Sequence, residues 1–67
     1  MTYTVIYEEK ATGNMGSLTF ISTRHDKNYA WVEFKETYAT EGQVPLMIMP
    51  GNHIVYFASD ISFTNVA

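Results

Sequence analysis

Only one stretch of this sequence has helical periodicity, and that limits what the remainder of the chain can form. Between residues 23 and 39, apolar side chains recur at intervals of three and four residues, which is the spacing of one helix face. This stripe consists of Ala30, Trp31, Phe34 and Tyr38. The sequence therefore predicts a single helix, over about residues 23–39, whose apolar stripe must pack against a sheet.

The residues around the predicted helix mark its two ends. Ser22 or Thr23 is predicted as the N-cap, because a hydroxyl oxygen can accept a hydrogen bond from a free N–H of the first turn. Asp26 follows Thr23 by three residues and would complete an acidic variant of the capping box. The helix is expected to stop before Gly42, since glycine readily adopts the left-handed conformation found past helix ends.

Four other segments are rich in β-branched and aromatic residues, which predicts strands. They are residues 3–9, 17–22, 44–49 and 53–58. Gly13 and Asn14 separate the first two and predict a hairpin. Pro50 and Gly51 separate the last two and predict a type II turn, in which Gly51 has a positive φ. Residues 61–63 are interpreted as a short fifth strand or as a tail packed on the sheet.

The predicted fold is a two-layer α+β sandwich with the order β-β-α-β-β, in which one helix crosses one face of an antiparallel sheet. The 67 residues form one small domain, residues 1–67, and contain no cysteine that could stabilise it by a disulfide. Tyr3, Val5 and Tyr7 are predicted to face the helix. The strand residues expected to contact Trp31 and Phe34 are Val5, Leu18, Leu46 and Ile54.

No pattern in the sequence predicts catalysis, a metal site or a cofactor. His25 and His53 are the only histidines, and no paired spacing joins them to a carboxylate as in known zinc sites. Glu8 and Glu9 are adjacent on a predicted strand, so their carboxylates point to opposite faces and cannot act together. The glycines form no phosphate-binding motif. We therefore expect a protein that is not an enzyme.

Composition narrows the classes of partner. The net charge is −3 and the chain has only four Lys and Arg residues, which makes a phosphate-binding surface for nucleic acid poorly supported. No apolar run approaches the length needed to span a bilayer, and the start of the chain lacks the basic region of a signal peptide. We therefore predict no membrane association and a cytoplasmic location.

Two of the predicted strands, 44–49 and 53–58, are apolar on both faces, although one helix can cover only one face of a sheet. Met47, Met49, Val55 and Phe57 are predicted to lie together on the face away from the helix. Exposed apolar patches usually mark binding sites, and methionine suits adaptable interfaces. Tyr29 and Val32, which lie off the helix stripe, are predicted as a secondary surface.

The resulting hypothesis is a protein-protein interaction module that associates with a second copy, as a homodimer, or with a larger partner. One alternative is a small inhibitor, of the kind encoded by phages or mobile elements, that binds and blocks a host protein machine. A second alternative is a nucleic-acid-binding sheet, on which exposed tyrosine and phenylalanine rings would stack with bases.

Overall fold

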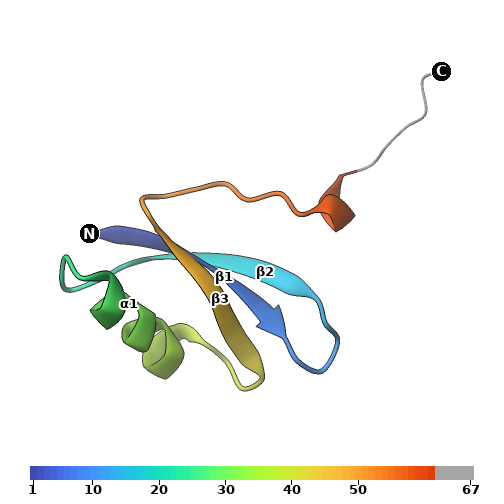
Figure 1. The fold of residues 1–67 in the computed structure, drawn as a ribbon, viewed down its shortest axis with the longest axis horizontal. Coiled ribbons are helices and arrows are strands. Elements are labelled where there is room, and N and C mark those ends of the chain that lie inside the picture. Colours follow the sequence, from blue (N-terminus) through green and yellow to red (C-terminus); the bar gives the residue numbers. More distant parts are fainter. Residues whose placement is uncertain (62–67) are drawn as a thin grey trace.

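A three-stranded antiparallel sheet and one helix form the fold in the computed structural model, which describes residues 1–61 (Figure 1). The strands are β1 (Thr2–Glu9), β2 (Met15–Ile21) and β3 (Gln43–Pro50). The helix α1 (Lys27–Glu33) continues into a π-helix, η1 (Phe34–Tyr38), and a short 3-10 turn, η2 (Ala58–Asp60), follows later. The prediction of an α+β fold is confirmed.

The predicted β-β-α-β-β order is wrong in one element. The sheet order is β2-β1-β3, and residues 53–58 form no strand in the part of the chain that the structure describes. Residues 53–57 leave the plane of the sheet after β3 and do not pair with it, and Ala58 begins η2. The predicted alternative of a fifth strand at residues 61–63 falls mostly outside the described residues.

The central strand β1 pairs with both neighbours, and its alternation sets the two faces of the sheet. Val5 lies opposite Leu18 on β2 and Ile48 on β3, and all three face the helix. Thr4 and Ile6 point to the other face, which we call the back of the sheet. β1 and β2 form the predicted hairpin, closed at its end by the Glu9 N–H, which donates to the Asn14 carbonyl at 2.8 Å.

An aromatic cluster between the sheet and the helix forms the core. Its buried members are Tyr3, Val5, Phe20, Ala30 and Phe34. Phe34 is fully buried, and its ring centroid lies 6.0 Å from that of Tyr7 and 6.3 Å from that of Phe20. The prediction that Tyr3, Val5 and Tyr7 face the helix is confirmed, and so is the place of Phe34 in the core.

Two predicted core residues are exposed instead. Leu46 falls at an irregularity where β3 shifts register against β1: Ile6 lies opposite Met47 and Tyr7 opposite Pro45. Leu46 therefore has no partner across the pair, and it is 48% exposed. Ile54 is 83% exposed because its segment is not part of the sheet. Trp31 is half-buried, so it contributes less to the core than predicted.

The helix begins later than predicted, because Asp26 is its N-cap. The Asp26 carboxylate accepts hydrogen bonds from the backbone N–H groups of Asn28 and Tyr29, at 2.9 and 3.4 Å. A carboxylate so placed satisfies two N–H groups of the first turn, whereas the Ser22 hydroxyl accepts only from the N–H of Arg24, at 3.3 Å. The helical segment ends at Tyr38, and Gly42 adopts its positive φ of 88° within the following turn.

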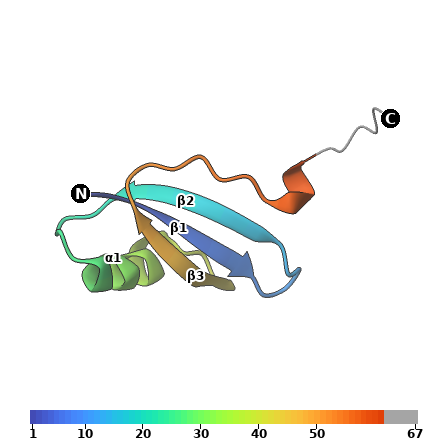
Figure 2. The same cartoon turned by 45° about the horizontal axis from the view of Figure 1, so that its top comes forward.

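After β3 the chain reverses and crosses the back of the sheet, opposite α1 (Figures 1 and 2). We call residues 51–57 the crossing segment. The Thr4 hydroxyl, which is fully buried, holds its start: it donates to the Gly51 carbonyl at 2.8 Å and accepts from the His53 N–H at 3.0 Å. The same hydroxyl lies 3.0 Å from that of Thr19. Gly51 has a φ of 98°, so the predicted positive φ at this turn is confirmed.

Candidate interaction surface

The crossing segment alternates between side chains that face the sheet and side chains that face outward. Val55 and Phe57 are half-buried, while Ile54 and Tyr56 are 83% and 73% exposed. An extended chain has this two-residue alternation whether or not it pairs with a neighbour. The segment therefore covers part of the back of the sheet and at the same time presents two large apolar side chains of its own.

Met47 and Met49 point to the same face of the molecule. They pair with Ile6 and Thr4, both of which are buried on the back of the sheet. Met47 is 51% exposed and Met49 is half-buried. We define the back surface as the residues that β3 and the crossing segment contribute to this face. They are Met47, Met49, Ile54, Val55, Tyr56 and Phe57.

The structure places the predicted interface residues differently from the expectation. Val55 and Phe57 lie on the crossing segment rather than on a strand beside Met47 and Met49, and they turn toward the sheet. The most exposed residues of the segment are instead Ile54, which the sequence predicts to contact the helix, and Tyr56. Sequence alternation correctly separates residues 54 and 56 from 55 and 57. It gives no sign of which set faces outward once the segment leaves the sheet.

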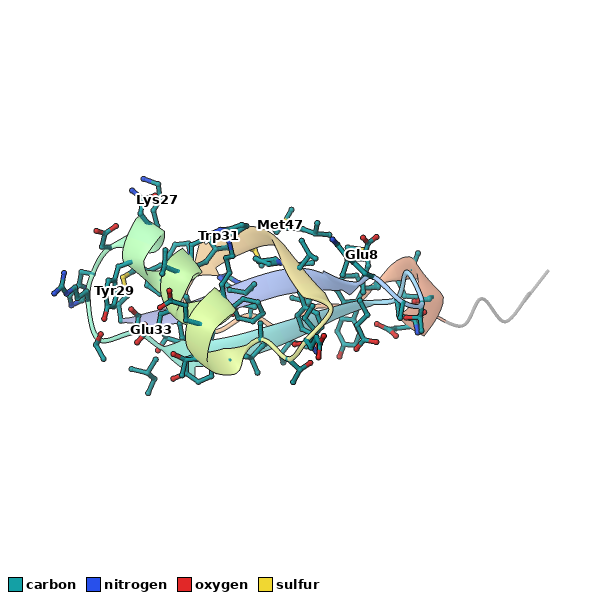
Figure 3. The ribbon with its side chains drawn as sticks, turned by 90° about the horizontal axis from the view of Figure 1, so that it is seen from below. Glu8, Lys27, Tyr29, Trp31, Glu33 and Met47 are labelled. Atoms are coloured by element: carbon teal, nitrogen blue, oxygen red, sulfur yellow. The ribbon has the colours of Figure 1, made fainter. Side chains whose placement is uncertain are left out.

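The secondary surface predicted at Tyr29 and Val32 lies on α1, on the other side of the sheet from the crossing segment (Figure 2). Both side chains are exposed, and the Arg24 guanidinium lies 4.6 Å from the centroid of the Tyr29 ring. Figure 3 shows Trp31 on the side of α1 toward β3, and α1 contacts that strand. Tyr29 and Val32 are therefore not part of the back surface.

Charge is absent from the region that forms the back surface. From Gly42 to Ser59 the sequence contains no Asp, Glu, Lys or Arg. The only histidine of this region is His53, whose Nε2 lies 2.7 Å from the Pro50 carbonyl oxygen and is therefore the donor. A surface of this composition offers few groups for ionic contacts and a large share of apolar area.

Polar side chains do not converge on a site within residues 1–61. No group of three or more His, Asp or Glu residues there is placed to hold a metal ion. Glu33 has one carboxylate oxygen, Oε1, that is buried without a hydrogen-bond partner among these residues. A hollow of about 550 Å3 lies between the β1–β2 turn and η2. Its one ionisable side chain, Asp60, already accepts a hydrogen bond from the Phe57 N–H at 3.1 Å.

Comparison with protein-family models, curated proteins and solved structures finds no match for this chain. Among the described residues, no helix combines the length and the apolar character needed to cross a membrane.

Proposed function

We propose that this chain is a non-enzymatic protein-binding module that presents its back surface to another protein. The observation that carries the proposal is the exposure of Ile54 and Tyr56, at 83% and 73%, on a segment that is itself anchored to the sheet. Single exposed apolar side chains are ordinary, but a cluster of them on one face of a soluble protein usually marks a binding site.

The anchoring distinguishes this segment from a loose tail. Thr4 holds the start of the segment through two hydrogen bonds, and η2 closes its end through the Asp60 N–H, which donates to the Phe57 carbonyl at 2.8 Å. Held in this way, the segment loses little conformational freedom when a partner binds. Preorganisation of this kind raises affinity for a given area of contact.

Charging the surface tests the proposal. Met47→Glu and Tyr56→Glu place a carboxylate where the partner's apolar side chains would pack, and both positions are exposed enough to leave the fold intact. Thr37→Glu, at an exposed position on η1, is the matched control. A partner isolated with the wild-type chain from the source cell is purified and titrated against all four proteins.

The expected result is binding to the wild type and to Thr37→Glu, with loss of at least tenfold in affinity for Met47→Glu and Tyr56→Glu. Light scattering on the same samples shows whether the partner is a second copy. Equal affinity of all four proteins for the partner would refute the back surface as the binding site.

A further inference from the structure

The two edges of the sheet differ in a way that bears on self-association. β2 and β3 are the edge strands of the described sheet, and each has a row of backbone N–H and C=O groups pointing away from β1. An uncovered edge is a template for pairing with another chain, and proteins block such edges with proline, charge or a covering element.

The edge of β3 is blocked. The Gly51 N–H donates to the Thr2 carbonyl at 2.7 Å, and the Lys10 N–H donates to the Gly42 carbonyl at 2.9 Å. Because backbone groups alternate along a strand, these bonds place Pro45 and Pro50 among the residues whose backbone faces outward. Proline has no N–H to offer there. The helix α1 also contacts this strand.

The edge of β2 is not blocked by proline or by charged side chains. The Ser22 N–H donates to the Met1 carbonyl at 2.8 Å. The backbone N–H and C=O groups of the even-numbered residues of β2 therefore point toward β1. The backbone groups that face outward belong to Met15, Ser17, Thr19 and Ile21. The strand contains no proline and no charged residue. Ile21 is 72% exposed.

The sequence of β2 is also self-complementary. Two copies paired antiparallel about Leu18 bring together residues whose numbers sum to 36. Met15 then lies opposite Ile21, Ser17 opposite Thr19, and Gly16 opposite Phe20, while Leu18 meets Leu18. Apolar side chains face apolar ones and hydroxyls face hydroxyls in the first two pairs. Gly16 and Phe20 add no side-chain contact across the pair, because the Tyr7 ring fills the space over Gly16 and Phe20 is buried in its own core. Cross-strand pairs of these kinds stabilise antiparallel sheets.

We propose that β2 pairs with β2 of a second copy, in this register, to form a symmetric dimer with a continuous six-stranded sheet. The outward-facing residues supply the hydrogen bonds, with residue 15 bonded to 21 and residue 17 to 19. A two-fold axis perpendicular to the sheet places both helices on the same face. α1 contacts β3, whereas Tyr38 of η1 packs on Phe20 of β2. The two copies of Phe20 lie on opposite sides of the two-fold axis at Leu18, so the two helical segments are offset along the paired strands.

This inference goes beyond the proposed function, because it uses the β2 edge and not the back surface. Each of the two proposals, the β2 dimer and partner binding through the back surface, can therefore be refuted without refuting the other. Ser17→Pro removes an outward N–H without removing a bond to β1, so it should abolish the dimer and leave partner binding intact. Met47→Glu should do the reverse. A dimer dispersed by Met47→Glu would overturn the assignment to β2 while supporting the back surface as an interface.

Cysteine cross-linking tests the register directly, since the chain has no cysteine of its own. In the proposed dimer the two Leu18 residues form a pair without hydrogen bonds, whose Cα atoms lie about 4.5 Å apart, within the range that a disulfide bridges. The two Ser17 residues are offset along the strands, and their Cα atoms lie roughly 8 Å apart, outside that range. Leu18→Cys should cross-link under mild oxidation, and Ser17→Cys should not.

Sedimentation of the unmodified chain accompanies the cross-linking, so that the result does not depend on how well Leu18→Cys folds. We expect a dimer for the wild type and for Ser17→Ala, which retains the N–H, and a folded monomer by circular dichroism for Ser17→Pro. A wild-type monomer at the highest soluble concentration would overturn the inference. So would cross-linking of Ser17→Cys as efficient as that of Leu18→Cys.

Discussion

At the scale of single residues, Phe34 does more than any other side chain to hold the helical segment on the sheet. It is the largest fully buried side chain, and its ring lies close to those of Tyr7 and Phe20. The Phe20 ring in turn lies 4.8 Å from that of Tyr38, so the cluster extends along η1. A π-helical turn, closed by the Ala39 N–H donating to the Phe34 carbonyl at 2.8 Å, makes this placement possible.

Truncation of Phe34 is therefore expected to unfold most of the protein. Phe34→Ala removes a buried aromatic ring, which costs about 3–5 kcal/mol in a core, comparable to the whole stability of a domain this small. Val32→Ala, at a position 47% exposed on the same helix, is the control and should change the stability by less than about 0.5 kcal/mol. Urea unfolding followed by tryptophan fluorescence gives both values. A free energy of unfolding unchanged by Phe34→Ala would show that the stripe is not the core.

At the scale of elements, the turn at Gly51 decides where the chain goes after β3. Its φ of 98° lies in the region that side chains disfavour. It directs the chain onto the back of the sheet instead of into a hairpin. A Cβ at this position would also lie 3.2 Å from Nε2 of His53. At Gly42, whose φ is 88°, an added Cβ would meet no atom within 4 Å.

The comparison of these two glycines gives a prediction about the turn. Gly42→Val should cost about 1–2 kcal/mol for its backbone conformation alone. Gly51→Val has a similar backbone cost and also displaces the His53 ring. It should therefore lower the free energy of unfolding more than Gly42→Val does, and it should expose the crossing segment. Urea unfolding measures the first effect, and hydrogen exchange of the His53 amide measures the second. Faster exchange of that amide in Gly42→Val than in Gly51→Val would contradict this account.

Short-range sequence patterns were enough to predict the three strands and the turn at Gly51. Segments rich in β-branched and aromatic residues correctly located β1, β2 and β3, and Pro50-Gly51 correctly indicated a turn with positive φ. The same composition predicted a strand at residues 53–58, because an extended segment packed on a sheet is as rich in β-branched and aromatic residues as a strand within one. What separates the two cases is backbone pairing with distant residues, and sequence patterns do not specify it.

The candidate surface was predictable to the same extent. The excess of apolar residues in the C-terminal third indicated an uncovered face. It placed Met47 on the face of the sheet away from the helix, where the structure has it. The identity of the exposed residues depended on the path of the crossing segment, which the Thr4 hydroxyl fixes across more than forty residues of chain. No local pattern around Thr4 distinguishes this role from that of an ordinary strand threonine.

At the scale of the whole molecule, the chain has three layers: the helix, the sheet and the crossing segment (Figures 1 and 2). The third layer is thin, because a single extended chain covers the back of a three-stranded sheet. Thr4 and Ile6, on the face away from α1, are both buried, and the Thr4 hydroxyl bonds to the start of the segment. This arrangement explains how a chain with one helix shields both faces of its sheet and still leaves apolar side chains in solvent.

The layered arrangement predicts opposite outcomes for two adjacent substitutions. Val55→Glu forces a carboxylate toward the back of the sheet, so it should cost about 1–3 kcal/mol or detach the crossing segment. Ile54→Glu places the same carboxylate in solvent and should change the stability by less than about 0.5 kcal/mol, while weakening partner binding. The two variants have the same net charge, so the difference between them reports side-chain orientation alone. Urea unfolding and hydrogen exchange across residues 52–57 measure it, and a larger loss of stability for Ile54→Glu than for Val55→Glu would show that the segment packs with its other side against the sheet.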